Sequence, residues 1–240
     1  MRRKKTVNWE KYASAYDLMA HNNPSYQDIL AIMSQQSAGW SIKAGDMIAD
    51  LGAGTGNYST LLASLFPSAT VVHVDSSQEM NERASQKACF LSCKNLQVRT
   101  EAVDMVNFLP ESLAAVVCVH ALYTFPNYRH LISKMHRWLR PGGVLFVCDL
   151  GRPMDVNDWS RYIFREAYRQ DGLLATLRLF WKGRVVANQN RKIRALQESG
   201  DYPMHELAEF RKRFERCGFR TILSEECYRG YSDLIIAVKY

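Results

Sequence analysis

The sequence lacks the features that would assign the chain to a membrane, secreted or metal-binding class. No apolar run approaches the ~20 residues that a membrane-spanning helix needs. The basic start Arg2–Lys5 is not followed by the apolar core of a signal peptide. Six cysteines are present, but their positions have no zinc-site spacing. We therefore expect a cytoplasmic protein with free thiols, no membrane partner and no metal site.

A further absence concerns the glycine-rich stretch Asp50–Gly56, where a predicted strand turns into a helix. Its glycines alternate, whereas the dinucleotide fingerprint G-x-G-x-x-G would need its third glycine at position 57, which is Asn57. No Gly-Lys-Ser/Thr follows, which excludes a Walker-type phosphate loop. Asp50 would repel a phosphate and attract an amine. We infer a ligand that carries an ammonium group and a ribose, lying against a backbone without Cβ atoms.

Two further strands are predicted to end at the same edge. The apolar run Val71–Asp75 places an acid 23 residues beyond Gly52, where an acid can accept hydrogen bonds from ribose hydroxyls. The continuous apolar run Ala114–Val119 is typical of a strand covered on both faces. It delivers His120 and Tyr123 to the C-terminal edge of the sheet, where ligands bind in open α/β folds.

Four stretches in this order resemble the class I S-adenosylmethionine-dependent methyltransferases, of the small-molecule type that includes the ubiquinone and menaquinone C-methyltransferases. They are Ala49–Gly56, Val74–Met80, Val103–Met105 and Leu139–Leu145. The resemblance covers residues 9–150 well and the C-terminal ninety residues only in outline. It implies a doubly wound, Rossmann-like α/β fold: a seven-stranded, mostly parallel sheet whose last strand is antiparallel, with helices on both faces.

The resemblance also implies a set of residues that bind S-adenosylmethionine. They are Tyr16, Asp50, Gly52, Ala53, Gly54, Gly56, Asp75, Ser76, Met80, Asp104, Met105 and His120. In the family, the acid at Asp75 binds the ribose, the acid at Asp104 accepts from the adenine amino group, and the tyrosine at Tyr16 covers the methionine end. Each of three residues has an alternative to cofactor binding. Tyr16 could be a half-buried packing residue, Asp104 a helix N-cap and Met80 a core residue.

His120 and Tyr123 are the predicted catalytic residues. The resemblance places the residue that leaves the fourth strand beside the methyl group. Histidine is also the side chain best suited to accept a proton near neutral pH, while Tyr123 could orient the acceptor. The alternative is that His120 makes only a backbone contact to the cofactor, so that alignment alone explains the chemistry.

We expect one methyltransferase domain over residues 1–240, with an N-terminal helical cap at 1–40 and a helical lid inserted at 152–203. Residues 152–220 carry 15 Lys and Arg against 9 Asp and Glu, a net charge of +6. Arg161, Arg165 and Arg169 form a basic stripe at i, i+4 spacing that is either a solvated face or faces a ligand. Apolar residues at helical spacing follow, which predicts an apolar helix face. They are Leu173, Leu174, Leu177, Phe180 and Trp181.

The predicted function is transfer of a methyl group from S-adenosylmethionine to an oxygen, nitrogen or carbon nucleophile of a small molecule. The Asn/Asp-Pro-Pro-aromatic motif of adenine and many amide N-methyltransferases is missing after the fourth strand. The basic segment leaves an anionic acceptor as one option. The alternatives are an RNA methyltransferase, which the basic segment would attract to RNA, and a noncatalytic regulatory protein that binds S-adenosylmethionine. For the basic tail at 1–8, a solvated terminus is favoured over a nucleic-acid arm, and a nucleic-acid partner is disfavoured. The sequence does not indicate the oligomeric state.

Overall fold

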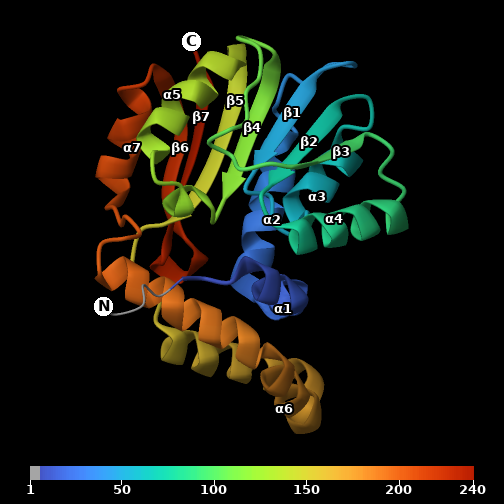
Figure 1. The fold of residues 1–240 in the computed structure, drawn as a ribbon, viewed down its shortest axis with the longest axis vertical. Coiled ribbons are helices and arrows are strands. Elements are labelled where there is room, and N and C mark those ends of the chain that lie inside the picture. Colours follow the sequence, from blue (N-terminus) through green and yellow to red (C-terminus); the bar gives the residue numbers. More distant parts are fainter. Residues whose placement is uncertain (1–5) are drawn as a thin grey trace.

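A computed structural model gives the fold and describes residues 6–240 (Figure 1). Most of the predicted basic tail, at residues 1–5, lies outside the described residues. The helices are α1 (Trp9–Asn22), α2 (Pro24–Ser37), α3 (Asn57–Leu65), α4 (Gln78–Phe90), α5 (Tyr128–Trp138), α6 (Val156–Glu198) and α7 (Leu207–Glu215). The strands are β1 (Met47–Leu51), β2 (Thr70–Asp75), β3 (Leu96–Thr100), β4 (Leu113–Val119), β5 (Leu139–Leu150), β6 (Phe219–Cys227) and β7 (Ser232–Lys239).

The strands form one sheet in the order β3-β2-β1-β4-β5-β7-β6. The pairs among β1 to β5 are parallel, and β7 runs antiparallel to both of its neighbours. The predicted doubly wound, mostly parallel seven-stranded fold is therefore confirmed. The strand order reverses between β1 and β4, and in such sheets ligands bind at the carboxyl ends of the strands at this point.

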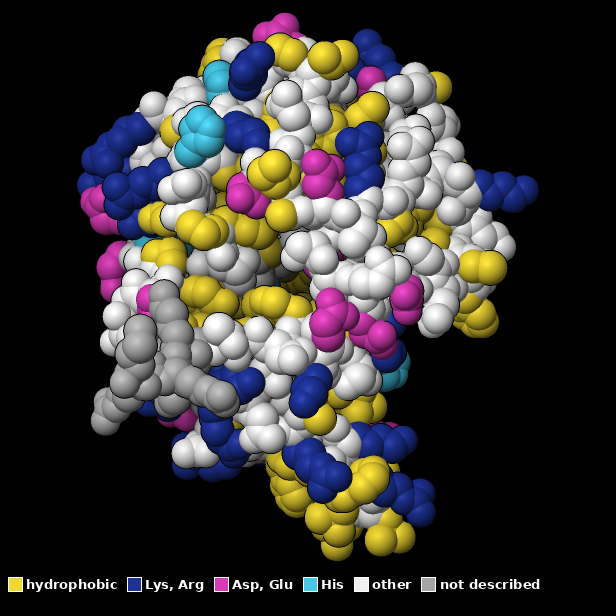
Figure 2. Space-filling model, viewed as in Figure 1, with side chains coloured by type: hydrophobic (Ala, Val, Ile, Leu, Met, Phe, Trp, Pro, Cys, Tyr) yellow, Lys and Arg dark blue, Asp and Glu magenta, His cyan; other side chains and the backbone are white. Residues whose placement is uncertain are grey.

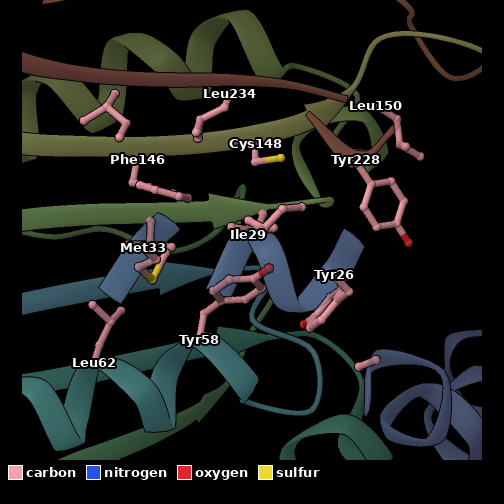
Figure 3. Close-up of a cluster of buried hydrophobic side chains, with 14 of the residues drawn as sticks. Tyr26, Ile29, Met33, Tyr58, Leu62, Phe146, Cys148, Leu150, Tyr228 and Leu234 are labelled. Carbon is pink, nitrogen blue, oxygen red and sulfur yellow. The ribbon is translucent and has the colours of Figure 1, made fainter. Parts of the chain in front are cut away.

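Helices cover both faces of the sheet and complete two apolar cores. On one face, Ile29 and Met33 of α2 pack with Leu62 of α3 and Phe146 of β5 (Figure 3). On the other face, α5 and α7 supply fully buried side chains such as Trp138 and Phe210. All seven residues of β4 are buried, which explains why that strand is apolar without alternation.

The break predicted near residues 21–24 has a local cause. Asn23 is extended, and its side chain accepts a hydrogen bond from the Ser25 backbone N–H, which caps α2. Pro24 follows at the first position of the helix, where a missing N–H costs nothing. These two residues end α1 and start α2 in a new direction.

Helix α6 is two helices joined at Gly172, whose φ of 75° and ψ of 179° are open only to glycine. The arms before and after Gly172 fold back on each other, with Phe164 and Phe180 in edge-to-face contact at 5.5 Å between ring centroids. The hairpin projects from the sheet at the lower end of Figure 1. No helix among residues 6–240 is long and apolar enough to cross a membrane.

The predicted apolar face of this segment is present in the sequence but is not buried. Leu173, Leu174, Leu177 and Trp181 are each more than half exposed. Because Gly172 turns the chain, these residues lie at and beyond the turn of a hairpin, and Trp181 borders a shallow cavity beside α1. Whether the hairpin acts as a lid stays a prediction.

Candidate active site

A cavity of about 270 Å³ lies at the C-terminal edge of the sheet, where β1, β2 and β4 end. It is therefore at the topological switch point. The structure brings together ten of the twelve residues that were predicted to bind the cofactor. Those lining the cavity are Tyr16, Asp50, Gly52, Ala53, Gly54, Asp75, Ser76, Met80, Asp104 and His120.

Gly56 and Met105 are not among the residues that line the cavity. Gly56 starts α3 with φ at 80°, and a Cβ on it would lie 2.8 Å from the Cβ of Ala84. The absence of a side chain at Gly56 therefore allows α3 to pack closely against α4. Met105 is 72% exposed, and its neighbour Val103 is buried and lines the cavity instead. This placement does not support a cofactor contact for either predicted residue.

The glycine-rich turn is built for close backbone contacts. Gly52 has φ at 66°, and a Cβ there would lie 2.4 Å from the Cβ of Ala121, the residue that follows His120. A side chain at Gly52 would therefore collide with the chain leaving β4. Gly54 also has a positive φ, but its missing Cβ faces open space, with Met80 Sδ nearest at 3.9 Å. This space allows a ligand to lie directly on the backbone.

The carboxylate of Asp75 is held in place by two backbone groups. Its Oδ2 accepts a hydrogen bond from the Gly54 N–H at 2.9 Å, and its Oδ1 accepts one from the Ser77 N–H at 2.9 Å. Each carboxylate oxygen can accept more than one hydrogen bond. A half-buried carboxylate with spare acceptor capacity, fixed at the end of β2, fits the hydroxyls of a ribose.

Asp50 lies deeper, at the start of a buried polar network that the sequence analysis missed. The Ser59 hydroxyl is 2.5 Å from Asp50 Oδ2 and 2.9 Å from His73 Nδ1. On the far side of the ring, His73 Nε2 is 3.0 Å from Asn81 Oδ1. The Asn81 amide donates to the backbone oxygen of Asp75 and to Thr100, which fixes its orientation. The histidine therefore carries its proton on Nε2.

The Ser59 hydroxyl has one hydrogen but two hydrogen-bond partners, Asp50 and His73 Nδ1. One of these two partners must therefore carry a proton of its own and donate it to the Ser59 oxygen. Burial raises the pKa of Asp50 to about 7 and lowers the pKa of His73 to about 4. Both shifts favour the proton on Asp50. A cationic group beside Asp50 would favour its carboxylate form instead. The donor and acceptor set therefore fits a ligand with an ammonium group near Asp50 and a diol near Asp75.

Helix α1 closes one side of the cavity. Trp9 and Tyr16 of α1 line it. Asp17 fastens the helix to the glycine-rich turn, because its carboxylate accepts a hydrogen bond from Thr55 at 2.5 Å and forms an ion pair with Lys87 at 3.0 Å.

His120 lies directly after β4, with φ at 52° in the left-handed region that is uncommon for a residue other than glycine. Its Nε2 is 2.9 Å from Ser232 Oγ, and its ring centroid lies 4.6 Å from that of Tyr228. Burial lowers the pKa of His120 to about 4. The ring is therefore neutral at pH 7, which suits a place beside a cationic sulfur, but it is a weak base.

Two more cavities lie between the first one and the hairpin, and each shares lining residues with its neighbour. The second shares Tyr16 and His120 with the first and is also lined by Tyr123, Tyr228 and Asn190. Tyr123, the second predicted catalytic residue, is thus brought next to His120 but not into the first cavity. The third cavity lies between α1 and both arms of α6 and shares Met19 and Asn190 with the second. Its lining is mainly apolar.

The basic stripe is remote from these cavities. None of Arg161, Arg165 and Arg169 is among the lining residues of the three cavities. Arg165 and Arg169 are 61% and 66% exposed, and both approach Glu166, at 3.2 and 3.5 Å. Within residues 6–240, no three His, Cys, Asp or Glu side chains are grouped as metal ligands.

Comparison with known proteins identifies similar sequences. Residues 48–143 match the methyltransferase domain family. A demethylmenaquinone methyltransferase of Bacillus cereus (strain AH187) is 25% identical over 234 residues, covering 96% of this chain and 93% of that protein. A trans-aconitate 2-methyltransferase of Azoarcus sp. (strain BH72) is 32% identical over 120 residues, covering 50% of this chain and 44% of that protein. A trans-aconitate 2-methyltransferase of Variovorax paradoxus is 34% identical over 102 residues, and the matched segment covers 37% of its length.

Solved structures share the fold. A putative S-adenosyl-L-methionine-dependent methyltransferase of Methanococcus maripaludis superposes with a TM-score of 0.61 at 18% identity, covering 100% of this chain and 97% of that chain. A SAM-dependent methyltransferase of Aquifex aeolicus superposes with a TM-score of 0.61 at 14% identity, covering 94% and 98%. At these identities the likeness concerns the fold.

Proposed function

The chain belongs to the class I S-adenosylmethionine-dependent methyltransferases, and from this membership we propose that it transfers a methyl group from S-adenosylmethionine to a small-molecule acceptor. The observation that carries the proposal is the first cavity, where two acids, Asp50 and Asp75, flank a glycine-rich turn. A bound S-adenosylmethionine supplies an electrophilic methyl group on a cationic sulfur. A cytoplasmic location, predicted from the sequence, is part of the proposal.

In this proposal each acid of the cavity recognises one part of the cofactor. Asp75 accepts hydrogen bonds from the ribose hydroxyls, and Asp50 faces the ammonium group. Asp104, exposed at the rim, accepts from the adenine amino group. Val103 and Met80 are buried side chains that line the same cavity and pack against the ring.

The acceptor enters from the second and third cavities. The second cavity adjoins His120, and the third extends it between α1 and α6 with mainly apolar walls. Arg184 is the only Lys or Arg among the residues that line the three cavities. This lining supports an acceptor with an apolar portion more than a strongly anionic one. The names of the demethylmenaquinone methyltransferases among the relatives point to the same acceptor class.

In this proposal the protein promotes methyl transfer mainly by aligning the acceptor with the methyl group, and less by removing a proton from the acceptor. Bound S-adenosylmethionine would supply the methyl group to the nucleophile of the acceptor, the electron pair of its carbon–sulfur bond would stay on sulfur, and any proton on the nucleophile would pass to solvent. Positioning of this kind can supply ~7–11 kcal/mol. His120 has a pKa of about 4, so at pH 7 it accepts a hydrogen bond more readily than it removes a proton. Tyr16 and Tyr123 line the second cavity beside His120, where they would hold the acceptor in line.

A methyl-transfer assay with labelled S-adenosylmethionine tests the proposal. The acceptors to compare are a quinol with an isoprenoid tail, the same head group without the tail, trans-aconitate and bulk RNA. We expect label in the tailed quinol in preference to its head group alone. Label only in RNA would favour the RNA-modifying alternative. Tight cofactor binding without transfer to any acceptor would favour the regulatory alternative.

A further inference from the structure

Large apolar side chains are exposed at the tip of the α6 hairpin, which we define as residues 161–184. Of the fourteen large apolar residues exposed in the described part of the chain, six lie here. They are Phe164, Tyr168, Leu173, Leu174, Leu177 and Trp181. They come from both arms and from the turn between them, so the apolar surface surrounds the tip. An exposed apolar cluster of this kind marks an interaction site.

Basic side chains surround this apolar surface. The tip contains six Lys and Arg against two acids, Glu166 and Asp171, a net charge of +4. All six basic residues are exposed. Figure 2 shows the apolar atoms at the lower end of the molecule with Lys and Arg side chains beside them. Arg184 also packs its guanidinium over the Trp181 ring, 4.7 Å from the centroid. The charge of the surface calls for an anionic partner.

The shape of the tip distinguishes between partners. A second copy would bring two surfaces of +4 together, which like-charge repulsion opposes. A folded protein would have to provide an acidic socket around both arms and the turn. A lipid surface can surround the tip, taking apolar side chains into the acyl boundary while Lys and Arg reach the head groups. Trp and Tyr are also the residues favoured at that boundary.

The third cavity adds a reason for this position. It lies between the arms of α6 and α1, so it occupies the space between the tip and the second cavity beside His120. A tip inserted among lipids would therefore bring the apolar route to the reaction centre close to the membrane.

We propose that the tip of the α6 hairpin docks on an anionic lipid bilayer as a peripheral anchor. This revises the expectation of no membrane partner without requiring a membrane-spanning helix. Docking does not depend on methyl transfer, so it can be tested even if the proposed reaction is wrong.

Co-sedimentation of the full chain with vesicles tests the docking. We expect binding to vesicles of equal parts phosphatidylcholine and phosphatidylglycerol, and at least about tenfold weaker binding to phosphatidylcholine alone. The double variant Leu174→Ser/Trp181→Ser should lose most of the binding. The matched control Phe90→Ser/Leu109→Ser removes two side chains that are 87% and 77% exposed elsewhere, and it should bind like the wild type.

Calorimetry with S-adenosylhomocysteine, together with the thermal unfolding midpoint, shows that each variant is folded. Absence of wild-type binding to anionic vesicles would overturn the proposal, as would equal binding by the tip variant and its control. A wild-type dimer that the tip variant converts to a monomer, without lipid binding, would also overturn it and make the tip an interface between copies.

Two further readouts separate insertion from simple charge attraction. Trp181 is 63% exposed, so its fluorescence should shift to shorter wavelength with anionic vesicles, and Trp181→Phe should remove the shift. Arg165→Gln/Arg169→Gln should weaken binding and its dependence on salt. Binding without any Trp181 shift would contradict insertion of the tip.

Discussion

The glycine-rich turn and the α6 hairpin depart from ordinary burial in opposite directions. Behind the turn, Asp50 and His73 are 1% and 0% exposed although both are titratable. At the tip of the hairpin, Leu174 and Trp181 are 73% and 63% exposed although both are apolar. Each arrangement is unfavourable in the isolated chain. In our proposals each region is shaped by what it binds, a polar cofactor at the turn and an apolar environment at the tip.

The largest effect should come from closing the space in the glycine-rich turn. Gly52→Ala forces a side chain into a left-handed conformation, at ~1–2 kcal/mol, and overpacks it against Ala121, at ~1–3 kcal/mol. Gly142→Ala is the matched control, since Gly142 has a φ of 74° but nothing within 4 Å of its missing Cβ. Urea unfolding should show the larger loss for Gly52→Ala. Equal losses would mean that close packing at the turn has no energetic role.

Removal of the ribose acceptor should be the next largest effect. Asp75→Ala should weaken S-adenosylmethionine binding by ~1.5–3 kcal/mol, the value of a hydrogen bond to a charged group. Titration calorimetry measures it, with Glu82→Ala on the exposed side of α4 as the control. An unchanged affinity for Asp75→Ala would show that the acid at the end of β2 does not bind the cofactor.

The buried network predicts a pH dependence. Burial raises the pKa of Asp50 to about 7, so its proton must leave before an ammonium group can bind well. Affinity for S-adenosylmethionine should therefore be highest above pH 7 and fall by about tenfold per pH unit below it, ~1.4 kcal/mol. In Asp50→Asn, overall affinity should drop and this slope should disappear. A slope that persists in Asp50→Asn must come from another group.

Replacement of His120 should lower kcat less than the loss of a general base would. A base with a well-matched pKa contributes ~10²–10⁴-fold, but the pKa of His120 is about 4. We expect His120→Gln, which can still form a hydrogen bond, to lower kcat by about tenfold or less. Single-turnover kinetics at pH 7 measure this. A loss of a hundredfold or more, with cofactor affinity unchanged, would restore His120 as the base.

The smallest effect should be at Met105. Because it is 72% exposed and outside the cavity, Met105→Ala should change cofactor affinity by less than ~0.5 kcal/mol. Val103→Ala, which enlarges the first cavity, should change the cofactor affinity more. The reverse order would mean that residues 103–105 rearrange when the cofactor binds.

The strands and the residues at their ends could be predicted because that information is local, whereas the seven-stranded topology and most of the cofactor residues were implied by the family resemblance. The strands before Gly52, Asp75 and His120 are apolar runs that end at marked positions, and parallel strands bring such ends to one edge. The network behind Asp50 could not be predicted in this way. His73 lies within an apolar strand, and only the pairing of β1 with β2 sets it opposite Asp50.

The hairpin shows a different limit of prediction from sequence. Apolar residues at helical spacing predict a face that packs on something, but the spacing does not say on what. The signal that could have been used is Gly172 between Asp171 and Leu173, because a glycine inside a helical pattern can mark a turn. Its φ and ψ place the apolar residues at the end of a projection instead of under the sheet.

The most direct test of the roles proposed for Asp50, Asp75 and His120 is a crystal structure with S-adenosylhomocysteine bound. We expect the ribose hydroxyls on the Asp75 carboxylate, the ammonium group beside Asp50 and the sulfur facing His120. The third cavity, between α1 and α6, should hold no part of that ligand. An adenosyl group bound elsewhere, or a ligand in the first cavity that touches neither Asp50 nor Asp75, would contradict these roles.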